Sequence, residues 1–377
     1  MPDLLVSQHL ELGLGILTGQ ALTDDPRTIA EEYRKTVDLA TVAESVGFDS
    51  VWLSEHHGAH DGYFPSLFPV LAAIAGRTTR LRLGTAVLIP ALHNPLRLAE
   101  DAAVVDLLSE GRLIVGLGLG WRSREFRDTG VEAAKRVGMT VDTIELLRLL
   151  WRGEPVSFEG RVHRFDGSLA LPTPYHPGGP PILLAGSSER PIRRAAAIAD
   201  GLLYSRSGPT AAFNQPDIDA LTTVLGMVRD TRGPVSAAAP DPFSITLITN
   251  AFAGDGDPWD TIGPGIDHAF TTYETWKAEE RGEDVTTAQL DKSAAFGRNL
   301  TLVGSPATVV AGLGRWVDHL AAKVPLRLVV RLHYPGMKFE ASAGAIETFG
   351  KEVAPALRDR AAAAVRHHSQ TGVNLRD

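Results

Sequence analysis

One short stretch of the chain ends an apolar run with an acid and two adjacent imidazoles. It reads FDSVWLSEHH over residues 48–57 and ends in Glu55, His56 and His57. Ionisable side chains do not stay in an apolar core unless they are paired, so these three are expected to line a pocket at the end of a buried strand. An imidazole beside a carboxylate can exchange protons near neutral pH. We therefore predict His56 as the catalytic acid or base, with Glu55 and His57 as its catalytic neighbours.

A metal site is a second interpretation of the same stretch. His60 and Asp61 add another imidazole and another carboxylate, and such groups can bind divalent cations. Successive residues of an extended chain point to opposite sides, however, so His56 and His57 are not expected to hold one ion together. We predict no bound metal. The chain has no cysteine, which excludes disulfides, thiolate nucleophiles and cysteine-ligated metal centres.

The composition favours a globular enzyme that acts on a small molecule. Of the 377 residues, 44% are hydrophobic and 22% are charged, as in proteins with a large core. A net charge of −8 argues against nucleic-acid and membrane-surface partners. The amino-terminal sequence lacks a basic segment followed by an apolar one, and no window approaches the roughly 20 apolar residues of a membrane span. We expect a cytoplasmic protein.

Short runs rich in Val, Ile and Leu alternate with longer amphipathic stretches, which is typical of repeated βα units. Amphipathic spacing predicts helices at residues 29–46, 95–108 and 139–151. Eight parallel strands would close into an α/β TIM barrel, (β/α)8. The expected strands are residues 12–17, 50–53, 81–88, 113–119, 182–185, 201–205, 244–249 and 326–332.

Two insertions interrupt the βα pattern, after the fourth and the seventh strand. The first, residues 153–179, contains a hairpin with strands expected at 155–159 and 161–165. The second, residues 253–298, is polar and glycine-rich at its start and then weakly helical, and we interpret it as a mobile lid over the site. Residues 1–365 are assigned to a single barrel domain, and residues 366–377 to a polar carboxyl-terminal tail.

Two small-residue motifs follow predicted strands. The sequence GLGLGW at residues 116–121 does not match the dinucleotide-binding spacing. Its glycines either remove side chains where a flat ring approaches the backbone or allow close packing of the strand. The turn Gly186-Ser187-Ser188 precedes a predicted helix at 192–199 and offers amides and hydroxyls to a phosphate. An ordinary serine helix cap is the alternative.

The segments FDSVWLSEHH, LRLGTAVLIPALHNPLRLAEDAAVVDLLSEGRLIVGLGLGWRSREFRDTGV and ILLAGSSERP resemble successive strands of the bacterial luciferase-like flavin-dependent monooxygenases. The resemblance implies a (β/α)8 barrel that binds reduced flavin at the carboxyl ends of its strands, in a homodimer. Because the chain has no pyridine-nucleotide fingerprint, we expect reduced FMN to come from a separate flavin reductase. By the resemblance, the protein would use reduced FMN and dioxygen to oxygenate a small organic substrate, an aldehyde or ketone, through a flavin C4a-hydroperoxide.

Position by position, the resemblance implies roles for individual residues. His56 matches the family's catalytic base, and the peptide between Ala86 and Val87 matches a cis peptide beneath the flavin ring. From the chemistry of the residues themselves we expect Trp52, Phe64, Phe68 and Trp121 to supply apolar walls, with a place in the barrel core as the alternative. Leu119 stands where the luciferase α subunit has a phosphate-binding arginine. The implied cofactor-binding residues are Thr85, Ala86, Val87, Gly118, Gly186, Ser187, Ser188 and Ser205.

Three alternatives stay open. A relative with the same fold uses a deazaflavin for hydride transfer and does not activate dioxygen. A metal-dependent barrel hydrolase would use the Glu55-His56-His57 cluster differently. An inactive flavin-binding subunit would bind FMN without turnover, and replacement of His56 would then change nothing.

Overall fold

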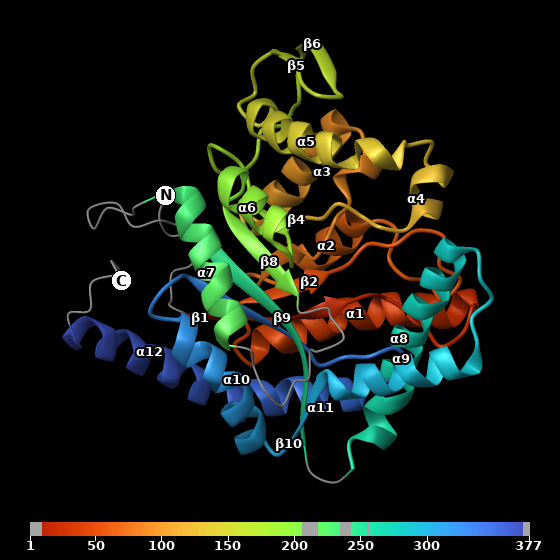
Figure 1. Cartoon of the computed structure of the whole chain (residues 1–377), viewed down its shortest axis with the longest axis vertical. Helices are drawn as coiled ribbons and strands as arrows, with labels where there is room; N and C mark the ends of the chain where they lie inside the picture. Colours follow the sequence, from red (N-terminus) through yellow and green to blue (C-terminus); the bar gives the residue numbers. More distant parts are fainter. Residues whose placement is uncertain (1–9, 206–217, 234–242, 255–256, 372–377) are drawn as a thin grey trace.

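The computed structural model describes residues 10–205, 218–233, 243–254 and 257–371, and its centre is a closed ring of parallel strands (Figure 1). Around the ring the order is β1-β2-β3-β4-β7-β8-β9-β11, and β11 pairs again with β1. The predicted TIM barrel and its eight strands are confirmed. These strands are β1 (Leu10–Leu17), β2 (Ser50–Leu53), β3 (Arg82–Thr85), β4 (Leu113–Leu117), β7 (Ile182–Ala185), β8 (Gly201–Ser205), β9 (Ser244–Ala253) and β11 (Leu326–Arg331).

Helices surround the barrel because their apolar faces cover the outward side chains of the strands. The predicted helices at 29–46, 95–108 and 139–151 are present as α1, α3 and α5. No helix in the described part of the chain has the length and hydropathy needed to cross a membrane. The helices outside the second insertion are α1 (Pro26–Ser45), α2 (Leu67–Ala75), α3 (Pro95–Leu108), α4 (Ser123–Asp128), α5 (Arg136–Leu150), α6 (Glu189–Ile198), α7 (Ile218–Arg232), α10 (Pro306–Leu320), α11 (Phe339–Thr348) and α12 (Ala354–Thr371).

Trp52 fills the inside of the barrel. Its side chain is fully buried, and its Nε1 donates to Ser50 Oγ at 2.9 Å. A Cβ atom at Gly84, on the neighbouring strand, would lie 2.3 Å from Trp52 Cε3, so glycine is required beside the indole. The predicted role of Trp52 as a pocket wall is therefore wrong, because its ring packs in the barrel interior. Ala86, Ile114, Leu183, Leu203 and Val329 share this inner core.

The first insertion is an antiparallel hairpin of β5 (Val156–Glu159) and β6 (Arg164–Ser168), as expected after the fourth barrel strand. The second strand starts three residues later than predicted. The buried Asp142 carboxylate accepts hydrogen bonds from the backbone N–H groups of Val162 and His163. These bonds hold the residues between β5 and β6 in a turn.

The second insertion follows the seventh barrel strand and consists of two packed helices, α8 (Trp259–Arg281) and α9 (Thr287–Asn299), drawn in teal and cyan in Figure 1. A short strand, β10 (Thr301–Gly304), then pairs with the end of β9. Residues 255 and 256 lie outside the described residues. At the other end of the chain, α12 continues through Thr371, past the predicted domain boundary at 365, and residues 372–377 are also outside the described part.

Candidate active site

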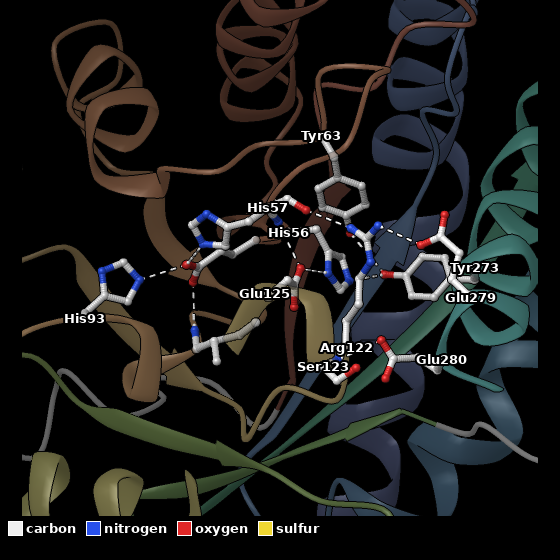
Figure 2. Close-up of polar contacts among 12 residues, drawn as sticks. His56, His57, Tyr63, His93, Arg122, Ser123, Glu125, Tyr273, Glu279 and Glu280 are labelled. Atoms are coloured by element: carbon white, nitrogen blue, oxygen red, sulfur yellow. Dashed lines mark hydrogen bonds and ion pairs between the residues drawn. The ribbon is translucent and has the colours of Figure 1, made fainter. Parts of the chain in front are cut away.

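The loop after β2 carries the predicted catalytic residues into a group of side chains from three different elements (Figure 2). Glu125 comes from α4, which follows β4, and Tyr273 comes from α8 of the second insertion. All of these segments meet at the carboxyl ends of parallel strands, where barrel enzymes place their catalytic groups. The sequence predicted the loop but not the two residues, Glu125 and Tyr273, that contact it.

His56 is held at both ring nitrogens. Its Nδ1 lies 2.8 Å from Glu125 Oε1, and its Nε2 lies 2.9 Å from the Tyr273 hydroxyl. Both His56 and Glu125 are buried, with 5% and 1% exposure. A carboxylate at Nδ1 favours the tautomer in which Nδ1 carries the hydrogen, so that Nε2 is left to exchange a proton with an oxygen. The arrangement is that of a general base directed at a hydroxyl group.

Aromatic rings enclose the Nε2 side of His56. The rings of Tyr63 and Trp276 lie 4.8 and 4.9 Å from the His56 ring, centroid to centroid, and that of Tyr273 lies 5.3 Å away. Burial raises the pKa of Tyr63 and raises the pKa of Tyr273 well above its usual value, so both phenols are neutral at physiological pH. Trp121 lies at 6.3 Å and is 40% exposed. It is the predicted wall residue that the structure brings to His56.

The second insertion is tied to this site by polar contacts. Arg122 donates to the His57 carbonyl at 2.7 Å and to Glu279 of α8 at 3.2 Å, and its guanidinium lies over the Trp276 ring. His268 of α8 contacts Asp61 at 2.8 Å. The segment predicted as a lid is therefore a pair of helices anchored against the catalytic loop; its mobility stays a prediction.

The side chains of His57 and His93 lie on the other side of the loop from the Nε2 of His56 (Figure 2), and both contact Glu55. Glu55 Oε1 accepts from His57 Nε2 at 2.7 Å and from His93 Nε2 at 2.8 Å. Burial opposes ionisation of Glu55, but hydrogen bonds from the two imidazoles outweigh it and hold its pKa below the usual range. The hydrogen bond to Glu55 raises the pKa of His57. As expected from the alternation of an extended chain, His56 and His57 point to different sides.

The carboxyl ends of the strands also offer a surface for a flavin-type cofactor. The Ala86–Val87 peptide is cis, as predicted. Four apolar side chains from different strand ends are only partly buried there, which suits a planar ring. At the start of α6, Ser187 and Ser188 are exposed, and the Ser188 side chain makes no capping hydrogen bond, so these hydroxyls are available to a phosphate. The four apolar residues are Ile16, Val87, Ala185 and Ile248.

Two of the predicted cofactor residues, Thr85 and Gly118, pack against neighbouring protein groups, and their contact with a cofactor stays a prediction. Thr85 is fully buried and bonds Gly116, donating to its carbonyl at 2.7 Å and accepting from its N–H at 2.8 Å. A Cβ atom at Gly118 would lie 2.3 Å from Val87 Cγ2. The glycines of the fourth strand thus allow close packing against the third strand and its continuation. Ser205 is exposed at the end of β8, and residues 206–217 beyond it lie outside the described residues.

Comparison with known proteins places this chain in a family. The model of the luciferase-like monooxygenases matches residues 11–220. The uncharacterized protein Rv0953c of Mycobacterium tuberculosis is 35% identical over 181 residues, covering 43% of this chain and 64% of that protein. The F420-dependent glucose-6-phosphate dehydrogenase of Nakamurella multipartita is 34% identical over 201 residues, covering 51% and 58%. The matches thus span less than two thirds of these relatives.

Among solved structures, monooxygenase RslO1 from Streptomyces bottropensis superposes with a TM-score of 0.72 at 24% identity. The superposition covers 92% of this chain and 99% of that one. At this level of identity the likeness concerns the fold.

Proposed function

Since this chain belongs to the luciferase-like monooxygenase family, whose members are flavin- or F420-dependent oxidoreductases, we propose that it transfers hydride between a deazaflavin and a hydroxyl-bearing small organic substrate. The observation that carries the proposal is the position of His56, with a buried carboxylate on Nδ1 and a hydroxyl on Nε2. The similarity to F420-dependent glucose-6-phosphate dehydrogenases over about half of the chain supports it.

The chemistry divides between the cofactor and the chain. When bound, a deazaflavin supplies a carbon that accepts or donates hydride. Oxidation of an alcohol also releases the hydroxyl proton, and His56 Nε2 would accept it. Glu125 would stabilise the resulting imidazolium and keep the ring oriented. The aromatic residues Tyr63 and Trp276 would exclude water from the reacting atoms.

A second candidate is an FMN-dependent monooxygenase that oxygenates an aldehyde or ketone with dioxygen, supplied with reduced FMN by a separate reductase. The enclosed aromatic surroundings of His56 favour it, because oxygen chemistry on a reduced flavin needs a pocket poor in water. The exposed hydroxyls of Ser187 and Ser188 suit an FMN phosphate as well as that of a deazaflavin. In this candidate His56 would again move the proton.

Anaerobic binding of reduced F420 and of reduced FMN, followed by admission of dioxygen, separates the two candidates. Preferred binding of F420, with alcohol-dependent reduction of the oxidised form and no oxygen-dependent product, supports hydride transfer. Preferred binding of FMN with an oxygenated product supports the monooxygenase and overturns the first proposal. Unchanged activity of the His56→Ala variant would contradict both, and binding without any turnover would indicate an inactive subunit.

We also propose that the protein is a homodimer. The outer face of α3 exposes Val104, Leu107 and Leu108, at 44%, 38% and 58%, and the loop residues Leu171 and Tyr175 are about half exposed. Exposed apolar groups of this kind are typical of a protein interface. Light scattering should give twice the mass of the chain, 40.4 kDa, and Leu108→Glu should reduce it to the mass of one chain.

A further inference from the structure

The cluster of Glu55, His57 and His93 has no part in the chemistry proposed above. The three side chains place one potential ligand atom each within 4.8 Å of one another. Glu55 is 1% exposed at its side chain, whereas His57 and His93 are 27% and 29% exposed. The carboxylate of the cluster is therefore buried, whereas its two imidazoles are partly exposed to solvent.

The sequence alone predicted no bound metal, because His56 and His57 point apart, but the structure brings His93 to His57 and Glu55 instead. We propose that these three residues bind a divalent transition-metal ion of the zinc type. Two imidazole nitrogens and one carboxylate oxygen form a common three-residue ligand set for Zn²⁺, and the open face leaves room for a water ligand. The ion would replace the two hydrogen bonds that now connect Glu55 Oε1 to His57 Nε2 and His93 Nε2. Only small outward movements of the two partly exposed rings are required.

The surroundings of Glu55 are suited to a metal ligand. Its second oxygen, Oε2, accepts a hydrogen bond of 2.7 Å from the backbone N–H of Ile89, which fixes the orientation of the carboxylate. Such contacts from outside the ligand set are typical of metal-binding carboxylates. Ile89 immediately precedes the short helical turn Pro90–Leu92, so a bound ion would link this turn to the loop after β2. It would stabilise these two segments, one of which carries His56.

This site goes beyond the proposed function and does not depend on it, since it can be tested without cofactor or substrate. The full-length protein, treated with a chelator and dialysed, is titrated with Zn²⁺ against a chromophoric chelator. One saturable equivalent is expected, and the melting temperature should rise with Zn²⁺ concentration. X-ray absorption should show nitrogen and oxygen neighbours at about 2.0–2.1 Å.

Variants identify the ligands. His93→Gln keeps a hydrogen-bond donor toward Glu55 but loses the imidazole, and it should weaken Zn²⁺ binding by at least about 100-fold. His60→Ala removes an exposed histidine of the same loop and should bind as the parent does, as should a variant without His367 and His368. Equal affinity of His93→Gln and the parent, or no saturable equivalent in the parent, would overturn the proposal. Circular dichroism establishes that each variant is folded.

Discussion

Glu125 Oε1 lies 2.8 Å from His56 Nδ1 and at the same time accepts the backbone N–H of His57 at 2.9 Å. One carboxylate oxygen thus contacts both the His56 ring and the backbone N–H of the next residue, although 69 positions separate Glu125 from His56 in sequence. Glu125 Oε2 is buried and has no hydrogen-bond partner in the described part of the chain. Burying an oxygen without a partner costs free energy, which favours a functional role for Glu125 over a purely structural one.

Replacement of Glu125 by Gln should therefore reduce catalysis strongly while leaving the fold intact. The amide is close in shape to the carboxylate but carries no charge to stabilise a protonated His56. We expect kcat to fall by roughly 10²–10⁴-fold, the usual contribution of general acid–base catalysis. Steady-state kinetics measure this, and cofactor affinity from fluorescence titration should change little. Glu340→Gln, an exposed acid on α11, is the matched control, and equal kcat in the two variants would remove Glu125 from the mechanism.

Tyr273 makes a hydrogen bond with His56 Nε2, the atom to which the substrate hydroxyl is expected to bind. Its hydroxyl lies 2.9 Å from Nε2 and 3.3 Å from the Tyr63 hydroxyl. A substrate hydroxyl would displace it, so Tyr273→Phe removes a competing hydrogen bond worth about 1 kcal/mol. We expect KM to fall by about five-fold with kcat nearly unchanged. Tyr63→Phe, which leaves the His56 contact in place, should keep the parent KM. A large loss of kcat in Tyr273→Phe would instead indicate that this phenol relays the proton.

The link between Asp61 and α8 predicts a pH-dependent stability. Burial would raise the pKa of Asp61, but hydrogen bonds from His268 and Gln20 outweigh it and hold the pKa below its usual 3.8. A carboxyl whose pKa is lower in the folded state stabilises the protein above its unfolded pKa, and that contribution is lost as pH falls through the folded value.

Urea denaturation of the parent and of Asp61→Asn between about pH 3 and pH 7 tests this link. The difference in unfolding free energy should be largest near neutrality and should shrink below about pH 4. Asp101→Asn, at an exposed ion pair on α3, should show little difference at any pH. A constant difference for Asp61→Asn across the range would contradict the assignment.

The barrel could be predicted from sequence because its strands are buried on both faces and appear as continuous apolar runs. The run at 81–88 was predicted too long, since β3 ends at Thr85, just before the cis peptide. Glu125, His93 and Tyr273 were missed because their contacts with the catalytic loop form only on barrel closure. Tyr273 is 217 positions from His56. Glu125 carried one signal, an acid in the segment that follows the fourth barrel strand.

The close packing of Gly118 against Val87 connects fold and site. A Cβ at position 118 would lie 2.3 Å from Val87 Cγ2 and 3.1 Å from its Cβ, so Gly118→Ala must displace the residue that follows the cis peptide. Overpacking of this kind costs about 1–3 kcal/mol in unfolding free energy. The displaced Val87 lies at the expected cofactor surface, so cofactor binding should weaken as well.

Val87→Ala provides the matched test, because it removes the methyl groups that the new Cβ would meet. In a double-mutant cycle, the Gly118→Ala, Val87→Ala protein should recover most of the lost stability and cofactor affinity, which gives a favourable coupling between the two positions. Urea denaturation and fluorescence titration measure the two quantities separately. Additive losses in the double variant would show that the backbone conformation at Gly118, rather than its contact with Val87, requires glycine. Recovery of stability without recovery of cofactor affinity would place the cofactor away from Val87.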